Sequence, residues 1–285
     1  CNHLCKKEEQ PILNFNTMKI KNILLMAGTA LILVACGTSK GGDDGPKKGV
    51  NLFTVEQDIE LGAQVAAEIE ADKAQFNILD SASNVAAYKY IYGIRDAILA
   101  TGKVTHKDDF KWQVRIIDND TTLNAFCTPG GYIYFYTGII KYLENEAELA
   151  GVMGHEMGHA DLRHSTRQMT KTYGVQLLLS AVLGDREALK QITTGLIGLK
   201  FSRAHETEAD EISVMYLCGT KWPADGGAGF FEKIEAQGGG RTPEFMSTHP
   251  SPANRIENYH TWAKEKGCTG SDNGAMSYKE FQKLF

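Results

Sequence analysis

Helical periodicity dominates the hydrophobic pattern of this chain. In residues 54–72 apolar side chains recur every three or four positions, which places them on one face of an α-helix. The same spacing predicts a second helix over residues 83–100. Beyond Tyr142 it predicts a series of further helices, over residues 144–162, 167–183, 186–199, 204–218, 225–237, 252–266 and 276–284.

Two short segments have the pattern of β-strands. Residues 110–117 alternate apolar and polar side chains, and residues 132–136 form a second run rich in tyrosine, entered through Pro129-Gly130-Gly131. Few strands before many helices predict an α+β fold that is mostly helical, with a small sheet early in the domain. We expect this domain to cover residues 51–285.

The first 50 residues have a different character. Residues 18–35 begin with a short basic segment and continue with an apolar stretch, as in a secretory signal peptide. Cys36 directly follows Leu-Val-Ala and resembles the acylated cysteine of bacterial lipoproteins. We therefore expect a lipoprotein signal peptide over 18–35 and a lipidated, flexible linker over 36–50. A plain signal peptide with a chance cysteine is the alternative, and we interpret residues 1–17 as an untranslated or non-native leader.

Composition narrows the class of protein. The chain has 285 residues, of which 42% are hydrophobic and 23% charged, as in an ordinary globular protein. A formal net charge of −5 gives no electrostatic reason to expect nucleic-acid binding. No apolar run reaches the roughly 18 residues needed to span a bilayer. The expected link to a membrane is therefore the lipid on Cys36.

Three cysteines remain in the expected domain: Cys127, Cys218 and Cys268. Export permits a disulfide bond, and an odd number leaves one free thiol. Cys218 and Cys268 are the predicted pair, because Cys127 lies in a segment expected near the active site.

A His-Glu-x-x-His motif lies inside a predicted helix. His155 and His159 are four residues apart, so their imidazoles lie on nearly the same helix face and can bind one ion. Zinc accepts such nitrogen ligands. Glu156 flanks the ion and is placed to take a proton from water there.

A third ligand is expected from the helix over 204–218. Glu206 and Asp210 are again four residues apart and share a face, whereas Glu208 points elsewhere. We predict Glu206 as the third ligand, with Asp210 behind it accepting an N–H from a ligating histidine. Two histidines and one carboxylate leave a fourth position open, as in a catalytic zinc site.

These motifs, with two further blocks, resemble the CAAX prenyl protease (type I) family of zinc metallopeptidases, and within it the soluble, periplasmic bacterial lipoprotein branch. The similarity extends over residues 54–264. It is found in four blocks: His155-Glu156-x-x-His159, Ser202-Arg203-x-x-Glu206-x-x-Ala209-Asp210, Thr248-His249-Pro250-Ser251-Pro252, and Asn124 to Gly131 before the strand that ends at Tyr136.

The resemblance implies a gluzincin fold with one Zn²⁺ per chain on His155, His159 and Glu206, and with Glu156 as base and acid. Cys127 departs from the small or aliphatic residue usual there and, near zinc, would allow oxidation or metal poisoning. The multispan membrane body of the prenyl-processing members is absent, so cleavage of prenylated peptides does not carry over.

Other polar residues have open roles. His249 is expected to donate to the oxyanion of the reaction, or to act as a fourth ligand that keeps the free enzyme latent. Arg255 is expected to brace the loop that contains His249 or to contact substrate, with an exposed helix arginine as the alternative. Extending the helix angle from His159 places His164 away from the metal, on the surface. His205 is likewise expected to face elsewhere.

The substrate is expected to pair with the strand after the glycine turn. An endopeptidase can bind an extended polypeptide through main-chain hydrogen bonds to an edge strand. The residues predicted for this edge are Gly131, Tyr132, Ile133 and Tyr134, and an internal strand is the alternative.

Together these features predict an exported, lipid-anchored zinc metalloendopeptidase. Its expected substrates are unfolded or flexible envelope proteins, which indicates protein quality control by analogy. Gly37 after the lipid-bearing cysteine suggests, again by analogy, the outer membrane facing the periplasm. One alternative is an envelope chaperone or assembly lipoprotein with latent or no protease activity. Another is a structural lipoprotein without metal, in which the motif is accidental. Nothing in the sequence identifies a partner protein.

Overall fold

A computed structural model describes residues 51–237 and 243–285. The predicted leader, signal peptide, lipid-bearing Cys36 and linker lie outside these residues. Within the described ranges, none of the helices combines the length and the hydropathy that are needed to cross a bilayer.

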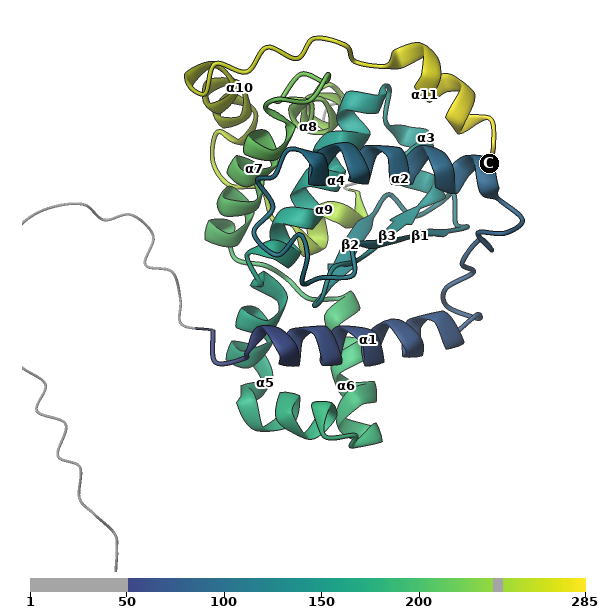
Figure 1. The fold of residues 1–285 in the computed structure, drawn as a ribbon, viewed down its shortest axis with the longest axis vertical. Coiled ribbons are helices and arrows are strands. Elements are labelled where there is room, and N and C mark those ends of the chain that lie inside the picture. The colour runs from purple at the N-terminus through teal and green to yellow at the C-terminus, as the bar shows by residue number, and fades with distance from the viewer. Residues whose placement is uncertain (1–50, 238–242) are drawn as a thin grey trace, which may run out of the picture. The chain divides into compact units, whose positions relative to one another are not determined.

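The predicted α+β fold class is confirmed: helices dominate and a small sheet precedes most of them (Figure 1). Each predicted helix and strand is present, with ends that differ by a few residues. In chain order the elements are α1 (Val55–Ala71), α2 (Val85–Ala100), β1 (Gln113–Ile117), β2 (Ala125–Thr128), β3 (Tyr132–Tyr136), α3 (Thr137–Tyr142), α4 (Glu146–Asp161), α5 (His164–Val182), α6 (Arg186–Ile197), α7 (Arg203–Leu217), α8 (Ala228–Ala236), α9 (Glu244–Thr248), α10 (Arg255–Glu265) and α11 (Ala275–Gln282). The prediction missed β2, α3 and α9.

The three strands have the order β1-β3-β2. β3 runs parallel to β1, with Tyr132 opposite Gln113, and antiparallel to β2, with Tyr134 opposite Phe126. The prediction that Gly131, Tyr132, Ile133 and Tyr134 form a substrate-binding edge is therefore wrong. The unrecognised strand β2 occupies one side of β3, and the main chain of Gln113 binds the Gly131 carbonyl at 2.9 Å on the other.

Helix α4 lies in the centre of the fold and is buried at every one of its 16 positions. β2, α2, α7 and α8 surround it, while α1, α5 and α6 pack together in a second apolar cluster at one end of the domain (Figure 1). Because α4 is covered on all sides, its polar side chains project into protein rather than into solvent. A helix with this surrounding can hold a buried polar site.

Glycines on α4 permit close packing against α7. A Cβ atom at Gly154 would lie 2.7 Å from Ser213 Oγ, and one at Gly158 would lie 2.6 Å from Ile212 Cγ2. Larger residues would force the two helices apart. The close approach places the first turns of α7 beside the histidines of α4.

The predicted Cys218–Cys268 disulfide is present. It joins the end of α7 to the segment that follows α10. Cys127, on β2, is a buried free thiol.

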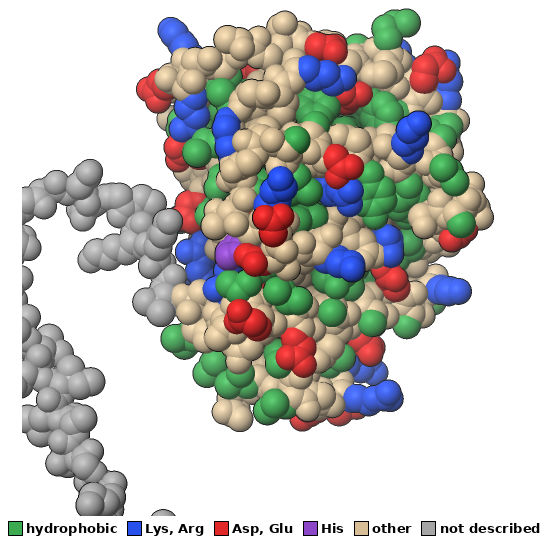
Figure 2. Space-filling model, viewed as in Figure 1, with side chains coloured by type: hydrophobic (Ala, Val, Ile, Leu, Met, Phe, Trp, Pro, Cys, Tyr) green, Lys and Arg blue, Asp and Glu red, His purple; other side chains and the backbone are tan. Residues whose placement is uncertain are grey.

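The face shown in Figure 2 has acidic and basic side chains interspersed with apolar ones. No extended basic surface is visible on this face of the described residues.

Candidate metal centre

Two imidazoles of α4 converge at the centre of the fold. His155 Nε2 and His159 Nε2 lie 3.0 Å apart, and both side chains are buried. One helical turn separates them, as the motif spacing predicts.

Glu206, in the first turn of α7, faces this pair. Its carboxylate oxygens lie 3.3 Å from His159 Nε2 and 3.5 Å from His155 Nε2. The N-terminus of α7 is fixed by Ser202, whose hydroxyl accepts the amide N–H of His205 at 3.2 Å.

His249, which follows α9, contributes a fourth group. Its Nδ1 lies 3.2 Å from Glu206 Oε1 and 3.2 Å from His155 Nε2. All four donor atoms lie within 4.8 Å of one another, and all four side chains are buried.

This donor set fits a tetrahedral metal ion. Zinc binds nitrogen and carboxylate oxygen at about 2.0–2.2 Å, so tetrahedral ligand atoms are separated by about 3.3 Å. Separations of 3.0–3.5 Å between five pairs of these side chains agree with that value. Three imidazoles and one carboxylate also favour zinc over magnesium or calcium, which bind mainly oxygen ligands.

Glu156 lies beside the four donors without joining them. It is completely buried, and neither of its carboxylate oxygens has a hydrogen-bond partner among the described residues. Its Oε1 is 3.6 Å from His249 Nε2. A buried carboxylate without a hydrogen bond is costly, and this one can accept a hydrogen bond from a reacting molecule at the site.

Cys127, on β2, lies next to Glu156 of α4. Burial and the adjacent Glu156 carboxylate raise the pKa of the Cys127 thiol well above its usual value. The thiol is therefore protonated at neutral pH and is not one of the four donors.

Asp210 and Arg255 support the ligands from behind. Asp210 Oδ1 lies 2.8 Å from His155 Nδ1, the geometry predicted for this pair. Arg255 Nη2 donates to Asp210 at 2.8 Å and to Glu206 at 3.2 Å. Arg255 is buried, so the alternative of an exposed helix arginine is wrong.

The charges in this cluster determine its protonation. Burial raises the pKa of Asp210, but the charge of Arg255 and the hydrogen bond and charge of His155 together outweigh this effect and lower the pKa overall. Burial lowers the pKa of His155, but hydrogen bonds to Asp210 and Glu206 raise it to about 9 overall. Because a metal can bind His155 only after its proton leaves, metal affinity should increase with pH.

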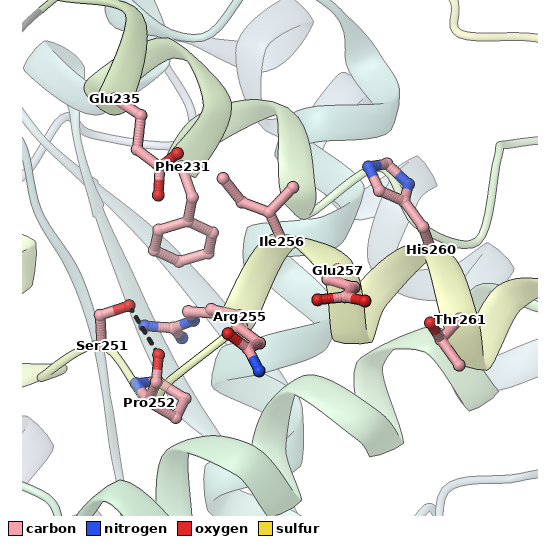
Figure 3. A pocket seen from close by; sticks show the side chains of 10 residues that line it. Phe231, Glu235, Ser251, Pro252, Arg255, Ile256, Glu257, His260 and Thr261 are labelled. Carbon is pink, nitrogen blue, oxygen red and sulfur yellow. Dashed lines mark hydrogen bonds between the residues drawn. The ribbon is translucent and has the colours of Figure 1, made fainter.

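A cavity of about 560 Å³ opens beside Arg255, between α8, α10 and the loop after His249 (Figure 3). The Arg255 side chain extends from α10 toward Ser251, and its guanidinium carbon lies 3.9 Å from the centre of the Phe231 ring. The Phe231 ring therefore covers one face of the guanidinium that binds Asp210 and Glu206.

The structure contradicts the surface position predicted for His164. Its side chain is completely buried, and its Nδ1 lies 3.0 Å from His159 Nδ1. The helix-angle argument fails because α4 ends at Asp161 and Arg163 takes a left-handed conformation (φ 58°), which turns the chain back. No glycine or proline marks this break in the sequence.

Two further residues lie close to His164. Glu208 points away from the four donors, as expected, and its Oε2 lies 3.0 Å from His164 Nε2. His205 stacks on His164 with ring centres 4.5 Å apart. Helical periodicity alone gives no sign of this cluster.

Residues 86–263, more than half of the chain, match the model of Peptidase family M48. The chain belongs to this family. M48 peptidases are zinc-dependent metallopeptidases, and the His155, His159, Glu206 and His249 group is suited to such an ion.

Individual M48 relatives are similar over different lengths. The chain is 31% identical to the mitochondrial metalloendopeptidase OMA1 of Schizosaccharomyces pombe over 182 residues, which are 62% of this chain and 53% of that protein. It is 28% identical to the metalloprotease YcaL of Escherichia coli over 249 residues, 83% of this chain and 94% of YcaL. It is 29% identical to the beta-barrel assembly-enhancing protease of Escherichia coli over 171 residues, 54% of this chain and 35% of that protein.

The chain thus spans about half or less of the OMA1 and assembly-enhancing relatives, and nearly all of YcaL. The narrower resemblance to the CAAX prenyl protease branch stays a prediction.

Proposed function

We propose that this protein is a zinc-dependent endopeptidase that hydrolyses peptide bonds in unfolded or flexible polypeptides. The observation that supports this most strongly is the buried four-donor group with an unpartnered carboxylate, Glu156, beside it.

In this proposal His155, His159 and Glu206 hold the zinc ion. When bound, zinc polarises the scissile carbonyl and increases the acidity of water. Glu156 takes the proton of the attacking water and passes it to the leaving amine. Asp210 accepts a hydrogen bond from His155 Nδ1–H. This keeps the proton on Nδ1 and leaves Nε2 free for the metal.

The edge strand available to an extended substrate is β2 rather than β3. β2 is an outer strand of the sheet, packs against α4 and contains Cys127, the neighbour of Glu156. Main-chain pairing along β2 would bind an extended polypeptide with little sequence preference.

This conformation suits a latent enzyme. His249 lies among the ligands, where it would fill the fourth position, so its position supports the ligand role over the oxyanion role. The Phe245 N–H of α9 also donates to the Leu123 carbonyl just before β2. We infer that α9 and His249 move together when substrate enters.

A second candidate function follows from the same observation. If His249 rarely leaves the ligand group, the protein would act as an envelope chaperone or assembly lipoprotein with latent proteolysis. Its surface would then bind client polypeptides that it seldom cleaves.

For location, we infer export, a lipid on Cys36, and attachment to the outer membrane facing the periplasm, with envelope quality control as the task. The signal-like residues 18–35 support export, and the Cys218–Cys268 disulfide suits an oxidising compartment. The motif resemblance further supports a place near the soluble branch of the CAAX prenyl protease group.

The test compares wild type and Glu156→Gln for cleavage of a denatured, alkylated protein, with and without a chelator. Wild type should contain about one equivalent of zinc, and chelation should abolish cleavage. Glu156→Gln should keep the zinc and lose roughly 10²–10⁴-fold in rate. Purified wild type that lacks zinc, or a Glu156→Gln variant that cleaves at the wild-type rate, would contradict the proposal.

His249→Ala separates the two roles of that histidine. A fourth ligand predicts weaker zinc binding and faster cleavage. An oxyanion donor predicts unchanged zinc binding and a rate lower by about 10²–10³-fold. A Glu156→Gln variant that supports wild-type function in cells would favour the chaperone.

A further inference from the structure

The two ligating histidines of α4 have different partners behind them. His155 Nδ1 contacts a carboxylate, Asp210 Oδ1, at 2.8 Å. His159 Nδ1 contacts another imidazole, His164 Nδ1, at 3.0 Å. A carboxylate, carbonyl or water is the usual partner of a ligating histidine, so the second arrangement needs an explanation.

The geometry fixes the direction of the hydrogen bonds. His159 Nε2 faces the other donor atoms, so a metal bound there leaves the imidazole proton on Nδ1. That proton can be donated only to an unprotonated His164 Nδ1. His164 then has its own proton on Nε2, which lies 3.0 Å from Glu208 Oε2.

Glu208 is itself held in place. Arg167 Nη2 donates to Glu208 Oε2 at 3.1 Å, and both side chains reach the edge of the buried region. The hydrogen bonds therefore run in one sense, from His159 through His164 to the carboxylate of Glu208.

Ring stacking limits the rotation of both imidazoles. Phe201 stacks on His159 with ring centres 4.1 Å apart, and His205 stacks on His164 at 4.5 Å. Since His159 and His164 are also completely buried, neither ring can turn without displacing its neighbours.

A strained turn brings His164 to this position. Arg163 has a left-handed conformation, which costs a non-glycine residue about 1–3 kcal/mol. Its side chain pairs with the buried Asp58 and donates to the Phe53 carbonyl at 2.5 Å, which ties the turn to α1. The chain thus retains a costly conformation at the point that places His164 behind His159.

We propose that His164, anchored by Glu208, is a positioning residue that fixes the tautomer and ring orientation of the metal ligand His159. The inference rests on the proposed metal-dependent function, but it concerns metal binding rather than proteolysis. Removal of such a partner behind a ligand typically lowers metal affinity by about 10–100-fold.

The test compares two substitutions of His164, one that keeps a hydrogen-bond acceptor for His159 and one that removes it. In His164→Asn the side-chain oxygen can take the place of Nδ1 and still accept the His159 proton. In His164→Phe the ring and its stacking on His205 remain, but the acceptor is lost. Zinc affinity is measured by competition with a chromogenic chelator, and ligand geometry by the visible spectrum of the cobalt-substituted protein.

We expect His164→Phe to bind zinc about 10–100-fold more weakly and to alter the cobalt spectrum, while His164→Asn recovers most of both. The melting temperatures of the metal-free variants report any general loss of folding. Wild-type affinity and spectrum in His164→Phe would overturn the proposal, and so would equal losses in Phe and Asn.

A second pair keeps the test decisive if His164→Phe does not fold. Glu208→Gln retains an oxygen acceptor for His164 Nε2–H, whereas Glu208→Leu does not. Only Glu208→Leu should weaken zinc binding, and equal affinities in the two variants would overturn the proposal. If wild type binds zinc in these assays but does not cleave denatured protein, the proposed function fails and this inference stands.

Discussion

Arg255 Nε lies 2.8 Å from Asp210 Oδ2, in a place where both side chains are almost completely buried. The same guanidinium reaches Glu206, so one cation balances the two carboxylates that hold the metal site together. Burying these charges is costly unless each is paired. The Arg255–Asp210 pair thus connects the stability of α10 and α7 to the geometry of the ligands.

Arg255→Met should therefore reduce the free energy of unfolding by about 3–5 kcal/mol, because it leaves buried carboxylates uncompensated. Arg255→Lys should lose less, since it keeps the charge but not the forked geometry. Urea denaturation of the zinc-loaded proteins measures both. A change in Arg255→Met of under about 1 kcal/mol, the size of an ordinary surface substitution, would contradict this account.

Close packing between α4 and α7 is open to a similar test. Gly154→Ala places a Cβ atom 2.7 Å from Ser213 Oγ and 3.1 Å from Leu217 Cδ1, so these side chains must turn away or α7 must shift, and a shift of α7 moves Glu206. We expect a loss of about 1–3 kcal/mol in stability, together with weaker zinc binding in a chelator competition.

Gly93→Ala is the matched control. Gly93 lies in α2, and nothing is found within 4 Å of a Cβ atom built there. This change should stabilise the protein by about 0.5–1 kcal/mol and leave zinc affinity unchanged. Equal zinc affinities in the two glycine variants would show that α7 does not depend on contact at Gly154.

The predictable part of the site is the part that lies within single helices. His155 and His159 share one helix, and Glu206 and Asp210 share another, so a period of 3.6 residues determines which side chains face together. That the two helices meet is an inference from chemistry, because a zinc ion on two histidines needs a third ligand and Glu206 can supply it.

The unpredicted part depends on the chain changing direction. His164 lies behind His159 because the helix breaks at Arg163, where no glycine or proline signals a turn. β3 became an internal strand because the short segment Ala125–Thr128, buried at all four positions, pairs with it. Such a buried run has no alternation, so periodicity could not identify it as a strand.

The Cys218–Cys268 disulfide should be a major source of stability. It closes a loop with a sequence separation of 50 residues, for which chain entropy predicts about 4 kcal/mol. The double variant Cys218→Ala/Cys268→Ala should melt at a lower temperature by calorimetry, and reductant should lower the wild-type melting temperature but not that of the variant. If reductant has no effect on the wild type, the bond does not form in the isolated protein.

The start of α4 should make the stability of the protein depend on pH. Glu146 is nearly buried there and accepts hydrogen bonds from Trp222 Nε1 at 2.6 Å and Ser277 Oγ at 3.0 Å, beside Lys221 Nζ at 2.7 Å. Burial raises the pKa of Glu146, but hydrogen bonds from Lys221, Tyr90 and Trp222, with the charge of Lys221, together outweigh it and lower the pKa overall.

Because the folded-state pKa lies below the ordinary value of 4.5, the ionised Glu146 stabilises the protein above pH 4.5, and this contribution is lost as the pH falls through the lowered value. Glu146→Gln should reduce the free energy of unfolding at neutral pH by about 1–3 kcal/mol, and the difference from wild type should shrink below pH 4.5. Urea denaturation at a series of pH values measures it, with Glu144→Gln, an exposed neighbour, as the control that should change little. A difference between wild type and Glu146→Gln that stays constant from neutral to acid pH would show that the carboxylate acts through its shape and not through its charge.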